Sequence, residues 1–146
     1  MSFPYKRILC PIDFDDNATT AIKEAGALAR LLKAAVCVLH VIWINPLATE
    51  GYVLAELEES QSNAARAKMA EMTNRELAGV DYEINVIIGD PAEIVLATEK
   101  DLNADLIVMA THGRHGLTKL VLGSVAEKIV RDSTIPVLTI RNHHPD

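Results

Sequence analysis

Short apolar runs alternate along this chain with longer segments in which apolar residues recur every three or four positions. The run AVCVLHVIW at residues 35–43 is apolar on both of its alternating faces, as a strand buried inside a parallel sheet should be. Residues 18–33 instead place their apolar side chains on one face of a helix. Strands that alternate regularly with helices predict a parallel sheet with right-handed crossovers and helices on both faces.

The whole sequence follows this alternation without a break in composition and without an internal repeat. We therefore expect a single domain over residues 1–146, with a doubly wound, Rossmann-like α/β fold and five parallel strands in the order 3-2-1-4-5. The predicted strands are residues 6–13, 35–43, 82–88, 105–110 and 136–141. The predicted helices are residues 18–33, 54–78, 91–103 and 117–132, and residues 45–53 are expected to form a loop.

Residues typical of helix ends mark several of these boundaries. Asn17 is a natural N-cap for the first helix. Three residues mark the start of the third helix: Asp90 can cap it, the fixed φ of Pro91 suits its first position, and the Glu93 side chain can reach back from its third position. Gly79 suits the C′ position after the long, charged second helix. That helix carries only a thin apolar stripe, which consists of Leu57, Ala64, Met69 and Met72.

Charge and composition limit the functions that this chain can have. Its net charge is −6 with the acidic residues spread along the sequence, which argues against a nucleic-acid partner because phosphate backbones are bound by clustered Lys and Arg. No apolar run is long enough to span a membrane and no signal peptide is recognised, so we expect a cytoplasmic protein. Cys10 and Cys37 lie in predicted strands and are expected to be buried, reduced thiols.

Glycines follow the fourth predicted strand, at an edge of the sheet where ligands of doubly wound proteins bind. Gly113 and Gly123 flank a segment that leads into the last helix, so their backbone NH groups and the helix N-terminus can receive a phosphate. Arg114 would add a mobile positive charge there and Ser124 a hydroxyl donor. The same residues are equally typical of a plain turn between strand and helix, and their spacing matches neither a Walker A loop nor GxGxxG.

Polar residues at the other strand ends are fewer. Asp13 follows the first strand, where a carboxylate can accept hydrogen bonds from an adenine amine or ribose hydroxyls, or face a metal ion. His40, near the end of the second strand, is interpreted as a hydrogen-bonded core or rim histidine. His112 and His115 lie in the glycine segment without an identifiable nucleophile or carboxylate partner. We therefore assign no catalytic residue and no metal ligand from the residues alone.

Six segments, spread from one end of the chain to the other, match a known family. They are YKRILCPIDF at residues 5–14, LHVI at 39–42, GDPAEIV at 89–95, DLIVMATHGR at 105–114, LGSVAEKIV at 122–130 and IPVLTIR at 135–141. On these segments the chain resembles the universal stress protein family. Nucleotide-binding members carry Gly, two residues, Gly, nine residues, Gly, then Ser or Thr. Gly113, Gly123 and Ser124 match the last three elements, and Ala110 stands where the first glycine is expected.

The resemblance implies a site at the carboxyl ends of strands 1, 2 and 4. Asp13 would contact the adenosine, Pro11 would shape its pocket and the backbone of Val41 would read the adenine edge. Met109 and Ala110 would line the end of the fourth strand, and the methyl of Ala110 is expected to weaken binding or leave it unaltered. The triphosphate would be held by the Ser124 hydroxyl and by the backbone NH groups of Gly113, Gly123, Ser124 and Val125.

The resemblance also implies a function and partners. It places the chain among the members that bind ATP, with Mg²⁺, and predicts a homodimer that pairs through the C-terminal strand, residues 136–141. In that interpretation the protein is a nucleotide-dependent switch or regulator in a stress response. Two alternatives remain open: a slow ATPase or autophosphorylating enzyme, for which Asp13 and His112 are the only candidate bases, and a nucleotide-free dimeric scaffold.

Overall fold

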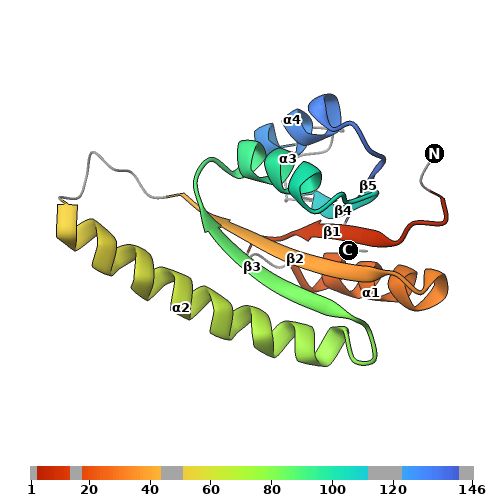
Figure 1. Cartoon of the computed structure of the whole chain (residues 1–146), viewed down its shortest axis with the longest axis horizontal. Helices are drawn as coiled ribbons and strands as arrows, with labels where there is room; N and C mark the ends of the chain where they lie inside the picture. The colour runs from red at the N-terminus through yellow and green to blue at the C-terminus, as the bar shows by residue number, and fades with distance from the viewer. Residues whose placement is uncertain (1–2, 14–17, 44–50, 112–122, 142–146) are drawn as a thin grey trace, which may run out of the picture.

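The computed structural model describes residues 3–13, 18–43, 51–111 and 123–141. Within them strands and helices alternate, as the sequence predicts (Figure 1). The elements are β1 (Arg7–Pro11), α1 (Ala18–Leu32), β2 (Ala35–Ile42), α2 (Gly51–Glu76), β3 (Tyr82–Ile88), α3 (Pro91–Asp101), β4 (Leu106–Thr111), α4 (Ser124–Asp132) and β5 (Val137–Arg141).

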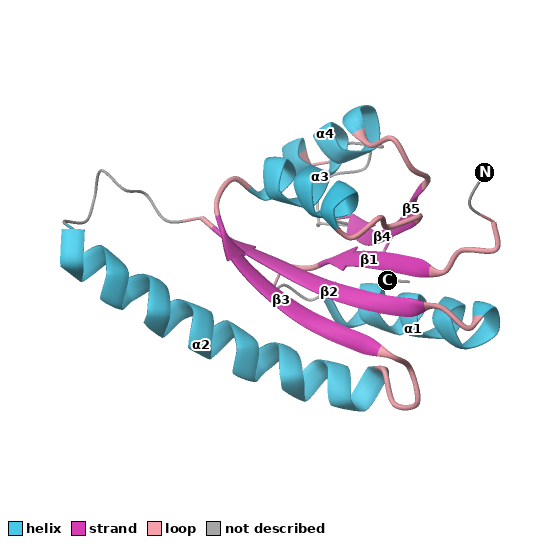
Figure 2. Ribbon diagram, in the orientation of Figure 1, coloured by secondary structure: helices cyan, strands magenta, loops and turns pink. Residues whose placement is uncertain are grey.

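The five strands form one parallel sheet in the order β3-β2-β1-β4-β5, which confirms the predicted fold class and strand order. Leu9 in the central strand pairs with Cys37 on one side and Ile107 on the other. Figures 1 and 2 show α1 and α2 on one face of the sheet and α3 and α4 on the other. The chain thus winds outwards in one direction through β2 and β3, and in the other through β4 and β5.

Each face of the sheet has its own apolar core, because successive side chains of a strand point to opposite faces. On one face, β1, β2 and β4 pack against α1 and α2 through buried residues that include Ile8, Cys10, Val36, Val38, Val108, Ile22, Ala25, Met69 and Leu77. On the other face, the alternate strand residues pack against α3 and α4, through Leu9, Cys37, Leu39, Ile107, Met109, Val95, Ala126 and Ile129.

Helices α1 and α2 approach closely at Gly26. A Cβ atom at this position would lie 2.9 Å from Leu77 Cδ2 and 3.0 Å from the Glu76 carbonyl oxygen. One turn further along α1, the Arg30 guanidinium donates hydrogen bonds to the carbonyl oxygens of Glu76 (2.9 Å) and Ala78 (3.1 Å). Carbonyls at a helix C-terminus have no partner within the helix, so Arg30 satisfies the end of α2 and holds it to α1.

The start of α3 has the predicted cap. The Asp90 carboxylate accepts a hydrogen bond from the Glu93 NH at 3.0 Å, and Pro91 is the first residue of the helix. The Glu93 carboxylate lies 4.0 Å from Lys128 Nζ of α4. It therefore faces the neighbouring helix across the α3–α4 layer, and its side chain does not make the predicted bond back to the start of α3 among the hydrogen bonds of the described residues. The predicted cap of α1, Asn17, lies outside the described residues.

Three predictions about helix α2 and its ends need correction. The helix begins at Gly51, inside the predicted loop 45–53, because a glycine is tolerated at a helix start and Tyr52 and Val53 continue directly into the helix. It ends at Glu76, so Gly79 is not directly at C′, although it does take a left-handed φ of +80° in the following turn. In the apolar stripe Met69 is buried, but Ala65 is buried where Ala64 was expected.

The last helix also begins later than predicted, at Ser124 instead of residue 117. Gly123 has extended backbone angles of φ −61° and ψ 160° and serves as the N-cap, so helix α4 begins at Ser124. Residues 117–122 lie outside the described residues. The first strand is shorter than predicted, Arg7–Pro11, and the fourth is displaced by one residue, Leu106–Thr111.

Both cysteines are buried and carry free thiols, as predicted. They lie on neighbouring strands but belong to opposite core clusters. Burial, with a smaller contribution from the charge of Cys37, raises the pKa of Cys10 from 9.0 to about 12. Burial, followed by the negative charge of Glu83, raises the pKa of Cys37 to about 12 as well. In the described part of the chain, none of the helices combines the length and apolar character that a membrane span requires.

We expect both thiols to resist alkylation at pH 8 in the folded protein, since the thiolate is the reactive form. Their raised pKa favours the folded state below the ordinary thiol pKa of 9.0 that applies when the chain is unfolded. That contribution is lost as the pH rises towards the folded-state pKa of about 12, so stability should fall in this window. A DTNB titration should find both thiols in guanidinium chloride and almost none in buffer. Rapid reaction of Cys37 in buffer would contradict its burial.

Candidate functional site

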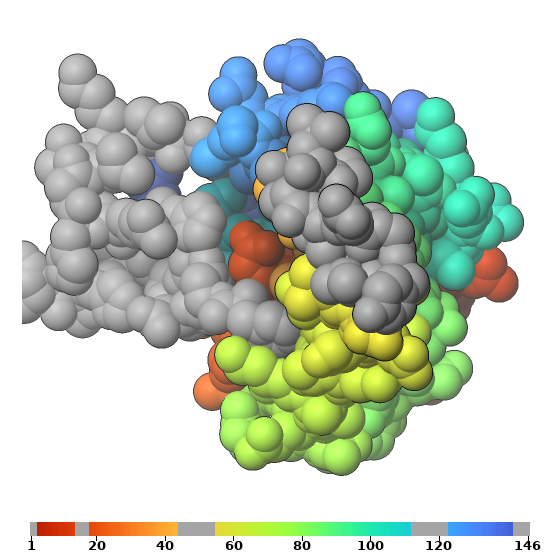
Figure 3. Space-filling view, turned by 90° about the vertical axis from the view of Figure 1, so that its left-hand side faces the viewer, coloured from red at the N-terminus to blue at the C-terminus, as the bar shows by residue number. Residues whose placement is uncertain are grey.

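A cleft lies at the carboxyl edge of the sheet, where the strand order reverses between β1 and β4. Figure 3 looks onto this edge and shows atoms of the end of β1 between those of α4 and α2. Residues from three strand ends and three helices line the cleft. They are Pro11, Ile12, Asp13, Ala18, Ala21, Val41, Pro91, Val95, Met109, Ala110, Val125 and Ile129. The topological rule for ligand sites in doubly wound sheets points to this same position.

The floor of the cleft is formed by the end of β1, and two hydrogen bonds hold it against β2. The Ile12 NH donates to the Leu39 carbonyl at 2.8 Å, so parallel pairing continues one residue past the strand. His40 Nδ1 lies 2.9 Å from the Ile12 carbonyl oxygen, which makes this ring nitrogen the donor. His40 is therefore a hydrogen-bonded rim histidine, as predicted. The two bonds position Asp13, the next residue, whose exposed carboxylate stands at the mouth of the cleft.

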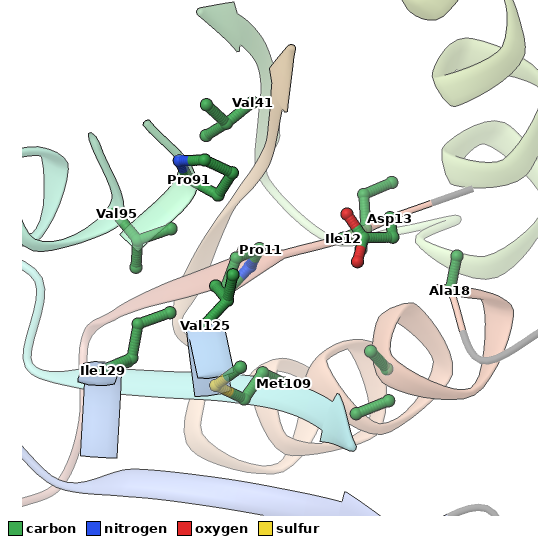
Figure 4. Close-up of a pocket in the computed structure, with 12 residues that line it drawn as sticks. Pro11, Ile12, Asp13, Ala18, Val41, Pro91, Val95, Met109, Val125 and Ile129 are labelled. Carbon is green, nitrogen blue, oxygen red and sulfur yellow. The ribbon is translucent and has the colours of Figure 1, made fainter. Parts of the chain in front are cut away.

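The walls of the cleft are mostly apolar. Figure 4 shows Pro11 near the centre, with Val125 and Ile129 of α4 on one side of it and Asp13 and Ala18 on the other. Val95 of α3 adds to the α4 side. Asp13 is the only ionisable side chain among the described lining residues. A flat apolar ring fits such walls, while a carboxylate at the mouth accepts hydrogen bonds from amine or hydroxyl groups.

The N-terminus of α4 lies beside these walls and has no side-chain cap of its own. Its N-cap is Gly123, and the first NH bonded within the helix is that of Glu127, which donates to the Gly123 carbonyl at 2.9 Å. The NH groups of Ser124, Val125 and Ala126 precede that bond and have no partner inside the helix. Together with the helix dipole they favour an anion at this end of the cleft.

Ala110, the residue at the expected family glycine, has its methyl on the other side of the sheet. The even-numbered residues of β4 face α1, and Ala110 packs with the α1–α2 core cluster. It pairs with Ile140 of β5, and Met109 before it faces α3 and α4. The methyl group is therefore directed away from the N-terminus of α4.

Six of the residues predicted from the resemblance line this cleft: Pro11, Asp13, Val41, Met109, Ala110 and Val125. Gly123 and Ser124 are not among the lining residues but immediately precede Val125 at the start of α4. Gly113, Arg114, His112 and His115 lie outside the described residues. Sequence reasoning missed the α1 and α3 walls, Ala18, Ala21, Pro91 and Val95, and also Ile12 and Ile129. The helical period predicted that Ala21 faces the core, but it did not show which strand ends that face of the helix covers.

Among the described residues no cluster of three or more His, Cys, Asp or Glu side chains is placed to hold a metal ion. The fold and the cleft define the class of the protein, a doubly wound α/β protein with a binding cleft at its switch point. A family model described as the universal stress protein family matches residues 4–141. The chain belongs to this family.

Relatives and solved structures match nearly the whole chain. Universal stress protein MJ0531 of Methanocaldococcus jannaschii is 33% identical over 142 residues, which cover 94% of this chain and 82% of the relative. Universal stress protein MJ0577 of the same organism is 31% identical over 159 residues, covering 97% and 98%. A solved structure of MJ0577 matches with a TM-score of 0.84 over 97% of this chain and 99% of that chain. The structure of UspA from Lactobacillus plantarum matches in fold with a TM-score of 0.79 at 24% identity, over 94% and 98%.

Proposed function

We propose that this protein binds ATP, together with Mg²⁺, in the carboxyl-edge cleft, and that nucleotide occupancy controls its conformation or its choice of partner. The observation that carries the proposal is the placement of an apolar slot, one carboxylate and a helix N-terminus without a side-chain cap around a single cleft. These three features match the three parts of the ligand: base, ribose and phosphates.

The base and ribose belong at the β1 and β2 side of the cleft. The adenine ring would lie against Pro11 and Met109, with its edge towards the backbone of Val41. The Asp13 carboxylate at the mouth would accept hydrogen bonds from the ribose hydroxyls or the adenine amine. Because these contacts are to the nucleoside, they favour every adenine nucleotide equally.

The phosphates belong at the first turn of α4. The NH groups that precede the first intrahelical bond, and the Ser124 hydroxyl, would donate to phosphate oxygens. The described lining contributes a single carboxylate, so Mg²⁺ would be held largely by the phosphates and water. The methyl of Ala110 faces the α1 layer, which supports binding despite the departure from the family glycine.

Two solved structures of this fold contain adenine nucleotides. One is a universal stress protein in complex with cAMP, matching with a TM-score of 0.71 at 21% identity. The other is the universal stress protein of Archaeoglobus fulgidus in complex with dAMP, with a TM-score of 0.63 at 22% identity. At these identities the likeness to this chain is one of fold. It supports the proposal by showing that proteins of this fold can hold an adenine nucleotide.

The proposal includes a homodimer that pairs through β5. This strand is at one edge of the sheet, and Leu138 is 38% exposed on it. An edge strand with exposed apolar side chains tends to pair with another chain. A dimer through β5 would join the two copies beside the α4 layers that carry the phosphate ends of the clefts.

Native mass spectrometry of the purified protein tests nucleotide and dimer in one measurement. We expect a mass of two chains plus bound adenine nucleotide, identified by chromatography after denaturation. If the protein is purified empty, a calorimetric titration with Mg-ATP should show binding, since weak ligands are lost during purification.

Each part of the proposal has its own contrary result. A well-folded protein that neither retains nucleotide nor binds Mg-ATP in the titration would overturn the nucleotide site and favour the scaffold interpretation. A single-chain mass at micromolar concentration, confirmed by sedimentation, would overturn the dimer. Release of ADP from bound ATP over time would favour the slow ATPase.

A further inference from the structure

Glu99 is a charged residue in an unusual place. It lies on α3 and is only 2% exposed, although Glu is almost never fully buried without hydrogen-bonding partners. Its carboxylate accepts three hydrogen bonds from the segment between α4 and β5. The Ser133 hydroxyl donates to Oε1 at 2.7 Å, and the Thr134 hydroxyl and NH donate to Oε2 at 2.8 and 3.2 Å. The cleft residues make none of these bonds.

These bonds join three elements of the fold. Glu99 belongs to α3, Ser133 is the C-cap of α4, and Thr134 begins the connection to β5. The Ser133 hydroxyl also accepts a hydrogen bond from the Ile135 NH at 3.2 Å, which fixes the turn towards the edge strand. One buried carboxylate therefore determines where the C-terminus of α4 sits and where β5 begins.

The position of that C-terminus matters for the opposite end of the helix. Helix α4 has nine residues, and at about 1.5 Å per residue it is a short, stiff rod. A displacement of its C-terminus must be accompanied by a displacement or tilt of Ser124 and Val125 at its N-terminus. The apolar contacts of Ala126 and Ile129 hold the rod against the sheet, but apolar contacts tolerate sliding more than hydrogen bonds do.

We propose that Glu99 is a positioning residue for the phosphate end of the nucleotide site, acting through α4, and that it couples this end to the start of β5. The inference rests on the proposed nucleotide function. Because coupling between sites is reciprocal, a change at β5 would alter the affinity for phosphates through the same bonds. The nucleoside end of the cleft, built on β1, β2 and Met109 of β4, makes none of these hydrogen bonds.

The test compares the affinities of ATP and adenosine in Glu99→Gln by calorimetry. Ser133 and Thr134 donate to different carboxylate oxygens, and a carboxamide replaces one of these oxygens with an NH₂ group, so one of the two donors loses its acceptor. We expect the ATP affinity to fall by about tenfold and the adenosine affinity to stay within about twofold. Thr134→Val, which removes one hydroxyl donor and keeps the NH, is a milder variant and should give a smaller loss in the same direction.

Arg30→Ala is the matched control. It also removes hydrogen bonds between two elements, but in the α1–α2 layer, and should change neither affinity. Equal losses for ATP and adenosine in Glu99→Gln, or unchanged ATP affinity in a folded Glu99→Gln protein, would overturn the proposal.

A nucleotide-free measurement separates this inference from the proposed function. In an amide NMR spectrum of the free protein, Glu99→Gln should shift the signals of Ser124 and Val125 as well as those of residues 133–135, and Arg30→Ala should not. If the wild-type protein binds neither ligand, the proposed function fails, and these shifts alone decide the coupling. Signals of Ser124 and Val125 that do not move would overturn it.

Discussion

A Val125→Asp variant is expected to fold as stably as the wild-type protein and to lose about 100-fold in affinity for ATP. Val125 is the second residue of α4, lines the cleft and is 39% exposed. A carboxylate in the first turn of a helix interacts favourably with its dipole, so the fold should not suffer. The same carboxylate would lie beside the phosphates. At about 5 Å, one pair of like charges costs about 1 to 3 kcal/mol, and the upper end of this range corresponds to roughly two powers of ten in affinity.

The neutral variant Val125→Asn separates charge from shape, since Asn and Asp have nearly the same size. Its ATP affinity should remain within about fivefold of the wild-type value, and the difference between the two variants should shrink at high salt. Calorimetric titrations at two salt concentrations measure both effects. Equal ATP affinities for the Asp and Asn variants would mean that the phosphates do not lie at the start of α4.

Gly26→Val is expected to destabilise the α1–α2 layer strongly. A Cβ atom there would approach Leu77 Cδ2 at 2.9 Å and the Glu76 carbonyl oxygen at 3.0 Å, and valine adds two further methyl groups. Leu77 is fully buried and the Glu76 oxygen belongs to the backbone, so neither can yield without disturbing the surrounding packing. Overpacking costs about 1 to 3 kcal/mol, and we expect the upper end of this range. Urea unfolding followed by circular dichroism measures the change.

Lys23→Val, at an exposed position of the same helix, is the matched control. It introduces the same β-branched residue and should cost less than about 1 kcal/mol, the difference in helix propensity alone. If both variants lose equally little stability, the contact between α1 and α2 can open to admit a side chain at Gly26. That result would show the layer to be more loosely packed than the structure describes.

The fold was predictable because its signals are local. The period of apolar residues separates strands from helices. The start of α3 is marked by the adjacent residues Asp90, its N-cap, and Pro91, its first residue. The strand order then follows from the connection rules and from the resemblance to a known family. Boundaries failed where local signals were weak: residues 51–53, Gly-Tyr-Val, proved helical, and helix α4 began at Ser124 rather than at residue 117.

The candidate site was predictable on the side built from strand ends and less so on the side built from helices. Pro11, Asp13 and Val41 stand at positions that the topology rule names. Val95 lines the cleft because α3 packs over this part of the sheet, and that placement depends on the tertiary fold rather than on a local pattern. Glu99 is the clearest case, since its burial depends on Ser133 and Thr134, 34 and 35 residues further along the chain.

The two ends of α2 are held very differently, and this bears on how the molecule can vary. Towards its C-terminus Ala65, Met69 and Thr73 are buried, and Arg30 binds the last carbonyls. None of the described side chains from residue 55 to residue 64 is buried, and Figure 1 shows this part of the helix extending past the ends of the strands. Whole turns can therefore be added or removed there without disturbing either core. Relatives of different length can share one sheet and one cleft while the projecting N-terminal part of α2 differs in length from one to the next.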